Sequence, residues 1–115
     1  MIEIAFFKQE GDLVGFEASG HAGYDAYGRD IVCAAVSGIL LTTLGGIEEI
    51  VGIHPKVRRN DENGYLQVQL PLHLEEALRH DACLLIRSAE NGLRSISEQY
   101  PGFVRVINRN RRKSE

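Results

Sequence analysis

The chain has little of what holds many small secreted domains together, with only two cysteines in 115 residues and no tryptophan. It therefore lacks a disulfide framework, but a domain of this length buries enough surface to need neither disulfides nor a metal. No basic segment leads into an apolar run at the N-terminus, so we expect no secretory signal. The longest apolar stretch, residues 31–53, is interrupted by glycine, serine, threonine and glutamate, so we expect no membrane span. These features predict a cytoplasmic protein in which both cysteines are free thiols.

The chain also has no large excess of either positive or negative charge. Its net charge is -3, and charged residues make up 25% of the chain. This balance excludes a surface devoted as a whole to nucleic acid or membrane. Basic residues gather only at the end, at Arg109, Arg111, Arg112 and Lys113, where nothing is apolar. We therefore expect a single domain over residues 1–108 and a basic, flexible tail over residues 109–115. Without an aromatic platform beside it, we expect no nucleic-acid contact except through this tail.

The hydrophobic pattern predicts seven elements along the chain. Strands are expected at 1–8, 13–19, 56–59, 65–70 and 103–107, and helices at 31–53 and 73–99. Asn63-Gly64 is a strong turn signal between two of the strands, and Gly45-Gly46 weakens the first helix late. The order predicts an α+β domain, with a small mixed sheet of a hairpin, a second strand pair and a C-terminal strand packed against two helices. The first helix is apolar on most faces, so we expect it to be central and buried.

Cys33 lies where a helix start would make a thiol reactive. Asp30 is a good N-cap, which places Cys33 at the third helical position, inside the first turn. Free N–H groups and the positive end of the helix dipole stabilise a thiolate there, so we expect the pKa of Cys33 to be lowered. The same N–H groups can hydrogen-bond an oxyanion that forms on an attacked carbonyl.

His21 is a candidate base for that thiol. It ends the second predicted strand between Gly20 and Gly23, and the loop up to Asp30 can fold back to bring the imidazole against Cys33. Asp30 can orient the imidazole, serve only as the N-cap, or do both. Simpler interpretations also exist, since a lone cysteine is often a small buried apolar residue and a lone histidine a loop residue. The residues by themselves leave these interpretations open.

The segment Gly20-His21-Ala22, Gly28 and then Asp30-Ile31-Val32-Cys33-Ala34-Ala35-Val36-Ser37 resembles the signature of the ribosomal-processing cysteine protease family Prp. The resemblance covers nearly the whole chain apart from the basic tail. It implies that His21 and Cys33 are the catalytic pair. It also implies that Asp30, Ser37 and Gly20 take substrate-binding or orienting positions.

The resemblance further implies what the chain acts on. Family members are bacterial endopeptidases that remove the N-terminal extension of a large-subunit ribosomal protein through a thioester, without a cofactor. They are homodimers, and the loop between histidine and cysteine is a mobile cover over the site. On this basis we expect a ribosomal protein and a second copy of the chain as partners.

Two other interpretations belong to different classes of protein. One is a ribosome-associated RNA- or protein-binding module in which Cys33 is structural and the basic tail binds RNA. The other is a metal-dependent hydrolase, since His80 and Cys83 share one helical face. Zinc needs four ligand positions filled and two residues supply only half of them, so we expect no metal site.

Overall fold

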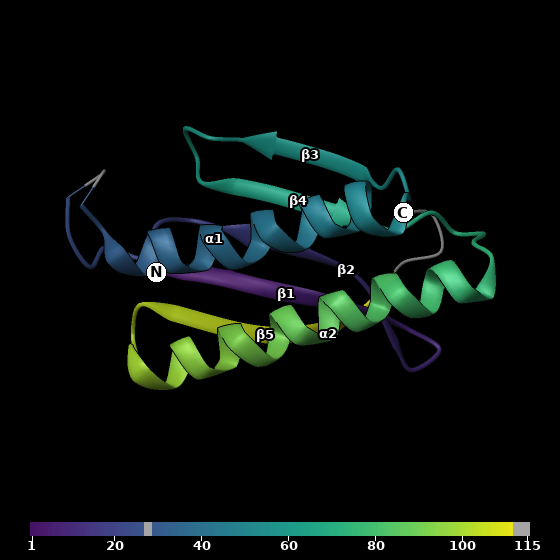
Figure 1. Cartoon of the computed structure of the whole chain (residues 1–115). Coiled ribbons are helices and arrows are strands. Elements are labelled where there is room, and N and C mark those ends of the chain that lie inside the picture. Colours follow the sequence, from purple (N-terminus) through teal and green to yellow (C-terminus); the bar gives the residue numbers. More distant parts are fainter. Residues whose placement is uncertain (27–28, 112–115) are drawn as a thin grey trace.

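A five-stranded mixed sheet forms one layer of the protein, and two helices lie on one of its faces (Figure 1). The computed structural model describes residues 1–26 and 29–111. The strands are arranged in the order β3-β4-β2-β1-β5, with β1 and β5 parallel and the other neighbours antiparallel. Their bounds are Ile2–Gln9 for β1, Asp12–Ser19 for β2, Lys56–Asn60 for β3, Tyr65–Gln69 for β4 and Val104–Asn110 for β5. This arrangement confirms the predicted α+β fold.

The first helical segment changes its winding where the two glycines occur. Helix α1 spans Ile31–Gly45 and continues as a short π-helix, η1, over Gly46–Val51. Glycine tolerates such a change at little steric cost, and Gly52 ends the segment with a φ of 83°. Helix α2 spans Glu76–Gln99, so it begins three residues later than the pattern predicts.

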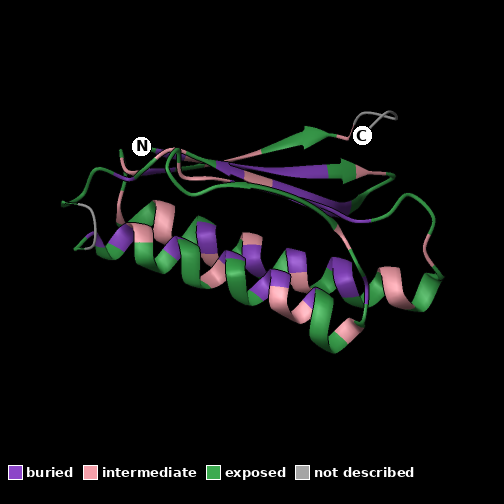
Figure 2. Cartoon of the chain, turned by 90° about the horizontal axis from the view of Figure 1, so that it is seen from above, coloured by how far each residue is buried: buried purple, intermediate pink, exposed green. Residues whose placement is uncertain are grey.

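The core lies between the sheet and the inner faces of the helices (Figure 2). Because side chains alternate across a strand, β1 and β2 each send every second residue into this layer. The register pairs Phe6 with Phe16, and their ring centroids lie 6.2 Å apart with both side chains fully buried. Val32, Val36 and Leu40 of α1 belong to the same buried cluster as the two rings.

The outer face of α1 is exposed, contrary to the prediction that this helix is buried all round. Ile31 is 56% exposed, Leu41 40% and, in η1, Ile50 84%. The prediction is wrong because an apolar composition does not require a neighbour on every side, and only one side of α1 meets the sheet. By length and composition alone Ile31–Val51 could cross a membrane, but the core helices of soluble proteins pass the same test.

Strand β5 runs three residues past its predicted end, so part of the expected tail belongs to the sheet. Arg109 pairs in register with Phe7, and its guanidinium lies 3.4 Å from carboxylate oxygens of both Glu3 and Glu17. Arg111 donates its backbone N–H to the carbonyl of Lys8 at 2.8 Å. The tail prediction is therefore wrong for residues 109–111, and residues 112–115 lie outside the described part of the chain.

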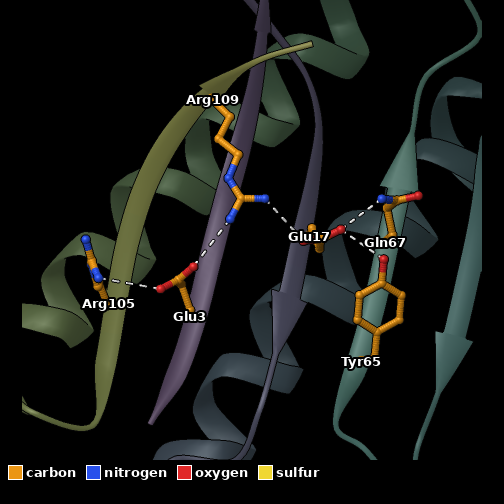
Figure 3. Close-up of polar contacts among 6 residues, drawn as sticks. All are labelled: Glu3, Glu17, Tyr65, Gln67, Arg105 and Arg109. Atoms are coloured by element: carbon orange, nitrogen blue, oxygen red, sulfur yellow. Dashed lines mark hydrogen bonds and ion pairs between the residues drawn. The ribbon is translucent and has the colours of Figure 1, made fainter. Parts of the chain in front are cut away.

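Arg109 belongs to a row of polar contacts that crosses four strands (Figure 3). Glu3 also lies 3.6 Å from Arg105, while Glu17 accepts hydrogen bonds of 2.9 Å from Tyr65 and Gln67. The sequence pattern missed these contacts because the partners of Arg109 come from the first two strands, about ninety to a hundred residues earlier.

This row predicts that the end of β5 contributes to stability. A chain that ends at Asn108 should lose about 1–2 kcal/mol of unfolding free energy relative to one that ends at Arg111, because two half-exposed ion pairs and several hydrogen bonds are removed. Chemical denaturation of the two truncated chains measures the difference. Equal unfolding free energies would show that residues 109–111 behave as a free tail.

Candidate active site

An open cleft of about 790 Å³ lies between the start of α1, the loop after β2 and the turn that joins β3 to β4. All five residues that the sequence singles out line this cleft, namely Gly20, His21, Asp30, Cys33 and Ser37. The fold thus brings together residues that are up to 17 positions apart in the chain.

The carboxylate of Asp30 organises one wall of the cleft. Its Oδ1 atom accepts the N–H groups of Val32 and Cys33, both at 3.0 Å, which confirms the predicted N-cap. Its Oδ2 atom accepts the N–H groups of Tyr24 at 3.0 Å and Asp25 at 3.4 Å, so the same side chain ties the loop to the helix. Burial alone would raise the pKa of Asp30, but these N–H donors outweigh it and hold the pKa below its ordinary value.

The thiol of Cys33 has a raised pKa, so the prediction of a lowered pKa is wrong for this state. Burial of the sulfur is the main cause, and the negative charge of Asp30 adds to it. A hydrogen bond of 3.2 Å from the Ala22 N–H to Sγ acts in the opposite direction but does not prevail. The sequence argument fails mainly because it leaves out burial of the sulfur. In addition, Asp30 occupies the N–H groups of Val32 and Cys33, which were expected to serve a thiolate and an oxyanion.

His21 is held at the end of β2 by a close approach of two backbones. Gly20 has a φ of 92°, and a Cβ atom there would lie 2.5 Å from the carbonyl oxygen of Met1, so only glycine fits. The exposed imidazole of His21 lies with Nε2 3.4 Å from the carbonyl oxygen of Glu62. Since the next residue, Ala22, hydrogen-bonds the sulfur, the chain carries His21 directly to the neighbourhood of Cys33.

The loop after His21 is anchored at its far side by aromatic packing. The ring of Tyr24 meets Tyr100 and Phe103 edge to face, with centroids 5.5 and 5.3 Å apart. This packing gives Tyr24 an anchoring role in the loop. Tyr27 and Gly28 lie outside the described residues.

The β3–β4 turn forms the wall opposite Cys33, and the sequence argument missed it. Arg59 and Asp61 line the cleft there and form an ion pair of 2.6 Å, and Gly64 and Tyr65 follow them. Asn63-Gly64 correctly predicts a turn, but nothing in the sequence indicates that this turn packs against residue 20 or 21.

The second cysteine lies away from this cleft. Cys83 is buried in the core and burial raises the pKa of its thiol, whereas the side chain of His80 is 74% exposed. Over residues 1–26 and 29–111, no three His, Cys, Asp or Glu side chains gather that could hold a metal ion. Cys33 and Cys83 are both free thiols.

Comparison with known proteins places this fold and cleft in one class. A family model described as cysteine protease Prp matches residues 1–105. The ribosomal processing cysteine protease Prp of Bacillus subtilis is 29% identical over 94 residues, which are 82% of this chain and 84% of the relative. The Prp of Staphylococcus aureus strain Mu50 is 26% identical over 99 residues, 86% of this chain and 90% of the relative.

Solved structures agree in fold. A Streptococcus mutans protein superposes with a TM-score of 0.84 at 28% identity, covering 96% of each chain. Staphylococcus aureus Prp with a covalently linked product peptide gives a TM-score of 0.84 at 24% identity, covering 95% of this chain and all of that one. The protein is a cysteine peptidase, and therefore a hydrolase. It belongs to the cysteine protease Prp family.

The contact between Asp30 and Cys33 gives a testable pH dependence. In the free protein we expect Cys33 to react with iodoacetamide with a midpoint above the free-thiol value of about 8.5. Asp30→Asn should lower this midpoint, because removal of the negative charge favours the thiolate while asparagine still caps the helix. Peptide mapping by mass spectrometry against pH measures the rate at Cys33 separately from Cys83.

Asp81→Asn, which removes an exposed carboxylate from α2, is the matched control and should leave the midpoint unchanged. An unchanged midpoint in Asp30→Asn would show that Asp30 does not govern the state of the thiol.

Proposed function

We propose that this chain is a cytoplasmic cysteine endopeptidase that removes the N-terminal extension of a large-subunit ribosomal protein, with Cys33 as nucleophile and His21 as base. The observation that carries the proposal is that Cys33 and His21 both line one open cleft. Family membership and the ribosomal processing named for two relatives support the substrate class.

The chemistry follows from the two side chains. His21 takes the proton of the Cys33 thiol, and the sulfur attacks the carbonyl carbon of the scissile peptide bond. The tetrahedral intermediate collapses to a thioester as the imidazolium returns the proton to the leaving amine. A water molecule, deprotonated by His21, then attacks the thioester, which releases the new carboxyl terminus and restores the thiol.

The raised pKa of Cys33 describes the protein without substrate. Two of the four N–H groups that Asp30 binds belong to the loop, at Tyr24 and Asp25, so movement of this loop would release the Oδ2 side of the carboxylate and leave Asp30 held only by the helix start. A peptide that displaces the loop would thereby let the Asp30 side chain rotate away, which would free the N–H groups of Val32 and Cys33 for the oxyanion. Asp30 is in this scheme a positioning residue.

Gly20 and Ser37 complete the proposed set. Gly20 allows the close backbone approach that sets the direction of His21, and so acts as an orienting residue. Ser37 is exposed in the cleft one helical turn beyond Cys33, where its hydroxyl can contact a bound peptide.

The catalytic pair can be tested directly. Cys33→Ala and His21→Ala should each reduce cleavage of a peptide spanning the ribosomal extension by at least ~1000-fold, because each removes a group that bonds or moves a proton in the reaction. Chromatographic assay of the two product peptides measures the rate, and circular dichroism checks the fold. Cys83→Ala should retain cleavage, since its thiol is buried outside the cleft. A Cys33→Ala variant that cleaves at the parental rate would overturn the proposal.

We further propose that the chain forms a homodimer through the outer face of α1. Ile31, Ala35 and Gly38 are exposed there in a row that repeats every three or four residues, and Leu41, which also lines the rim of the cleft, lies beside it. Small residues in such a row let a second helix approach closely, and burial of this apolar face in a dimer is favourable.

A charge on this face should separate the two copies. Ala35→Glu should raise the dimer dissociation constant at least about tenfold, because a carboxylate would be buried against its own symmetry mate. Sedimentation velocity measures the change, with Asn91→Glu on the exposed side of α2 as control. Equal dissociation constants for the two variants would place the interface elsewhere.

A further inference from the structure

The imidazole of His21 lies against the main chain of the β3–β4 turn. Its Nε2 atom is 3.4 Å from the carbonyl oxygen of Glu62. A carbonyl oxygen only accepts hydrogen bonds, so this contact requires the proton on Nε2 and leaves the lone pair of the neutral ring on Nδ1. A general base needs a lone pair, so with this tautomer the thiol proton would go to Nδ1.

A second contact presses the same turn against the segment that carries His21. Gly64 closes the turn with a φ of 60°, and a Cβ atom there would lie 2.5 Å from the carbonyl oxygen of Gly20 and 3.0 Å from Cε1 of His21. The two backbones therefore meet with no room for a side chain between them.

The turn itself is held by two hydrogen bonds. The N–H of Gly64 donates to the carbonyl of Asp61 at 3.2 Å, and the N–H of Asn63 donates to Oδ1 of Asn60 at 3.3 Å. The carbonyl of Glu62 thus projects from a turn that is itself tied at both ends. The strands on either side pair in register from Lys56 with Gln69 to Asn60 with Tyr65, which fixes the turn relative to the sheet.

We propose that the β3–β4 turn is the positioning element for His21, with the Glu62 carbonyl in the role that a carboxylate or carboxamide side chain plays in other nucleophile–histidine sites. The inference rests on the proposed role of His21 as base. When the ring takes the thiol proton, its Nε2–H becomes a stronger donor, so the bond to Glu62 stabilises the imidazolium. A distance of 3.4 Å before substrate binds is consistent with this role, because catalytic hydrogen bonds shorten in the substrate complex.

The test displaces the turn with one methyl group. Gly64→Ala should lower kcat at least about tenfold while KM stays within about threefold, because the ring is misplaced but the cleft remains. The acid limb of the kcat/KM profile should also move to lower pH, since the protonated ring loses a contact that stabilises it and gives up its proton more readily. The substrate is the peptide spanning the ribosomal extension.

Gly11→Ala is the matched control. Gly11 lies in the β1–β2 turn with a φ of 84°, but no atom lies within 4 Å of a Cβ there. Both variants therefore force an alanine into the left-handed region, and only Gly64→Ala also collides with His21. Gly11→Ala should keep the parental kcat and acid limb.

A second variant covers the case in which Gly64→Ala does not fold. Insertion of one glycine between Glu62 and Asn63 moves the carbonyl without adding a side chain, and the same loss of kcat is expected. If the parent cleaves the peptide but the displaced-turn variant matches Gly11→Ala in kcat and in acid limb, the inference is wrong and the proposed function stands. A parent that does not cleave would overturn both.

Discussion

The carboxylate of Asp30 is the group on which the rest of the cleft depends. Two of its hydrogen bonds begin α1 and two hold the loop that follows β2, so a single side chain joins the helix of Cys33 to the loop that follows His21. The negative charge of Asp30 stabilises one part of the site and destabilises another. The helix start gains a charged cap, which is stabilising, while the thiol of Cys33 gains a negative neighbour that disfavours its ionised form. The chain thus secures the geometry of the site at the expense of thiolate in the free protein.

The sheet brings segments that are distant in the sequence together at one end of its strands. Gly20 follows β2 and lies against the carbonyl of Met1. Gly64, at the end of the β3–β4 turn, lies against the carbonyl of Gly20. Both approaches need a residue without a side chain. Since β1, β2 and β4 are neighbours in the sheet, ordinary strand spacing brings these ends within contact of one another. The position of His21 is therefore set by backbone packing.

Local signals in the sequence predicted what is locally determined. The aspartate before an apolar run predicted the cap and the start of α1, Asn63-Gly64 predicted the hairpin turn, and alternation predicted the strands with small errors at their ends. Contacts between segments far apart in the chain could not be predicted from the sequence. The partners of Arg109 lie in β1 and β2, the partner of His21 lies 41 positions away, and no pattern in either segment encodes the other. The pKa of Cys33 was misjudged for a related reason, because burial of its sulfur depends on the folded surroundings, which a helix-start argument leaves out.

The parallel pairing of β1 with β5 has a consequence for how the chain folds. Ile2 pairs with Val104, so one side of β1 is covered by a strand about a hundred residues later. Contacts between residues this far apart form slowly, because the entropy of closing a long loop is lost before the contacts contribute any stability. Until β5 arrives, the hairpin of β1 and β2 presents an open edge of hydrogen-bonding groups, the kind of edge that pairs with other chains. During synthesis, the segments that line the cleft therefore emerge before β5 does. In this interval the edge of β1 that β5 later covers is still exposed.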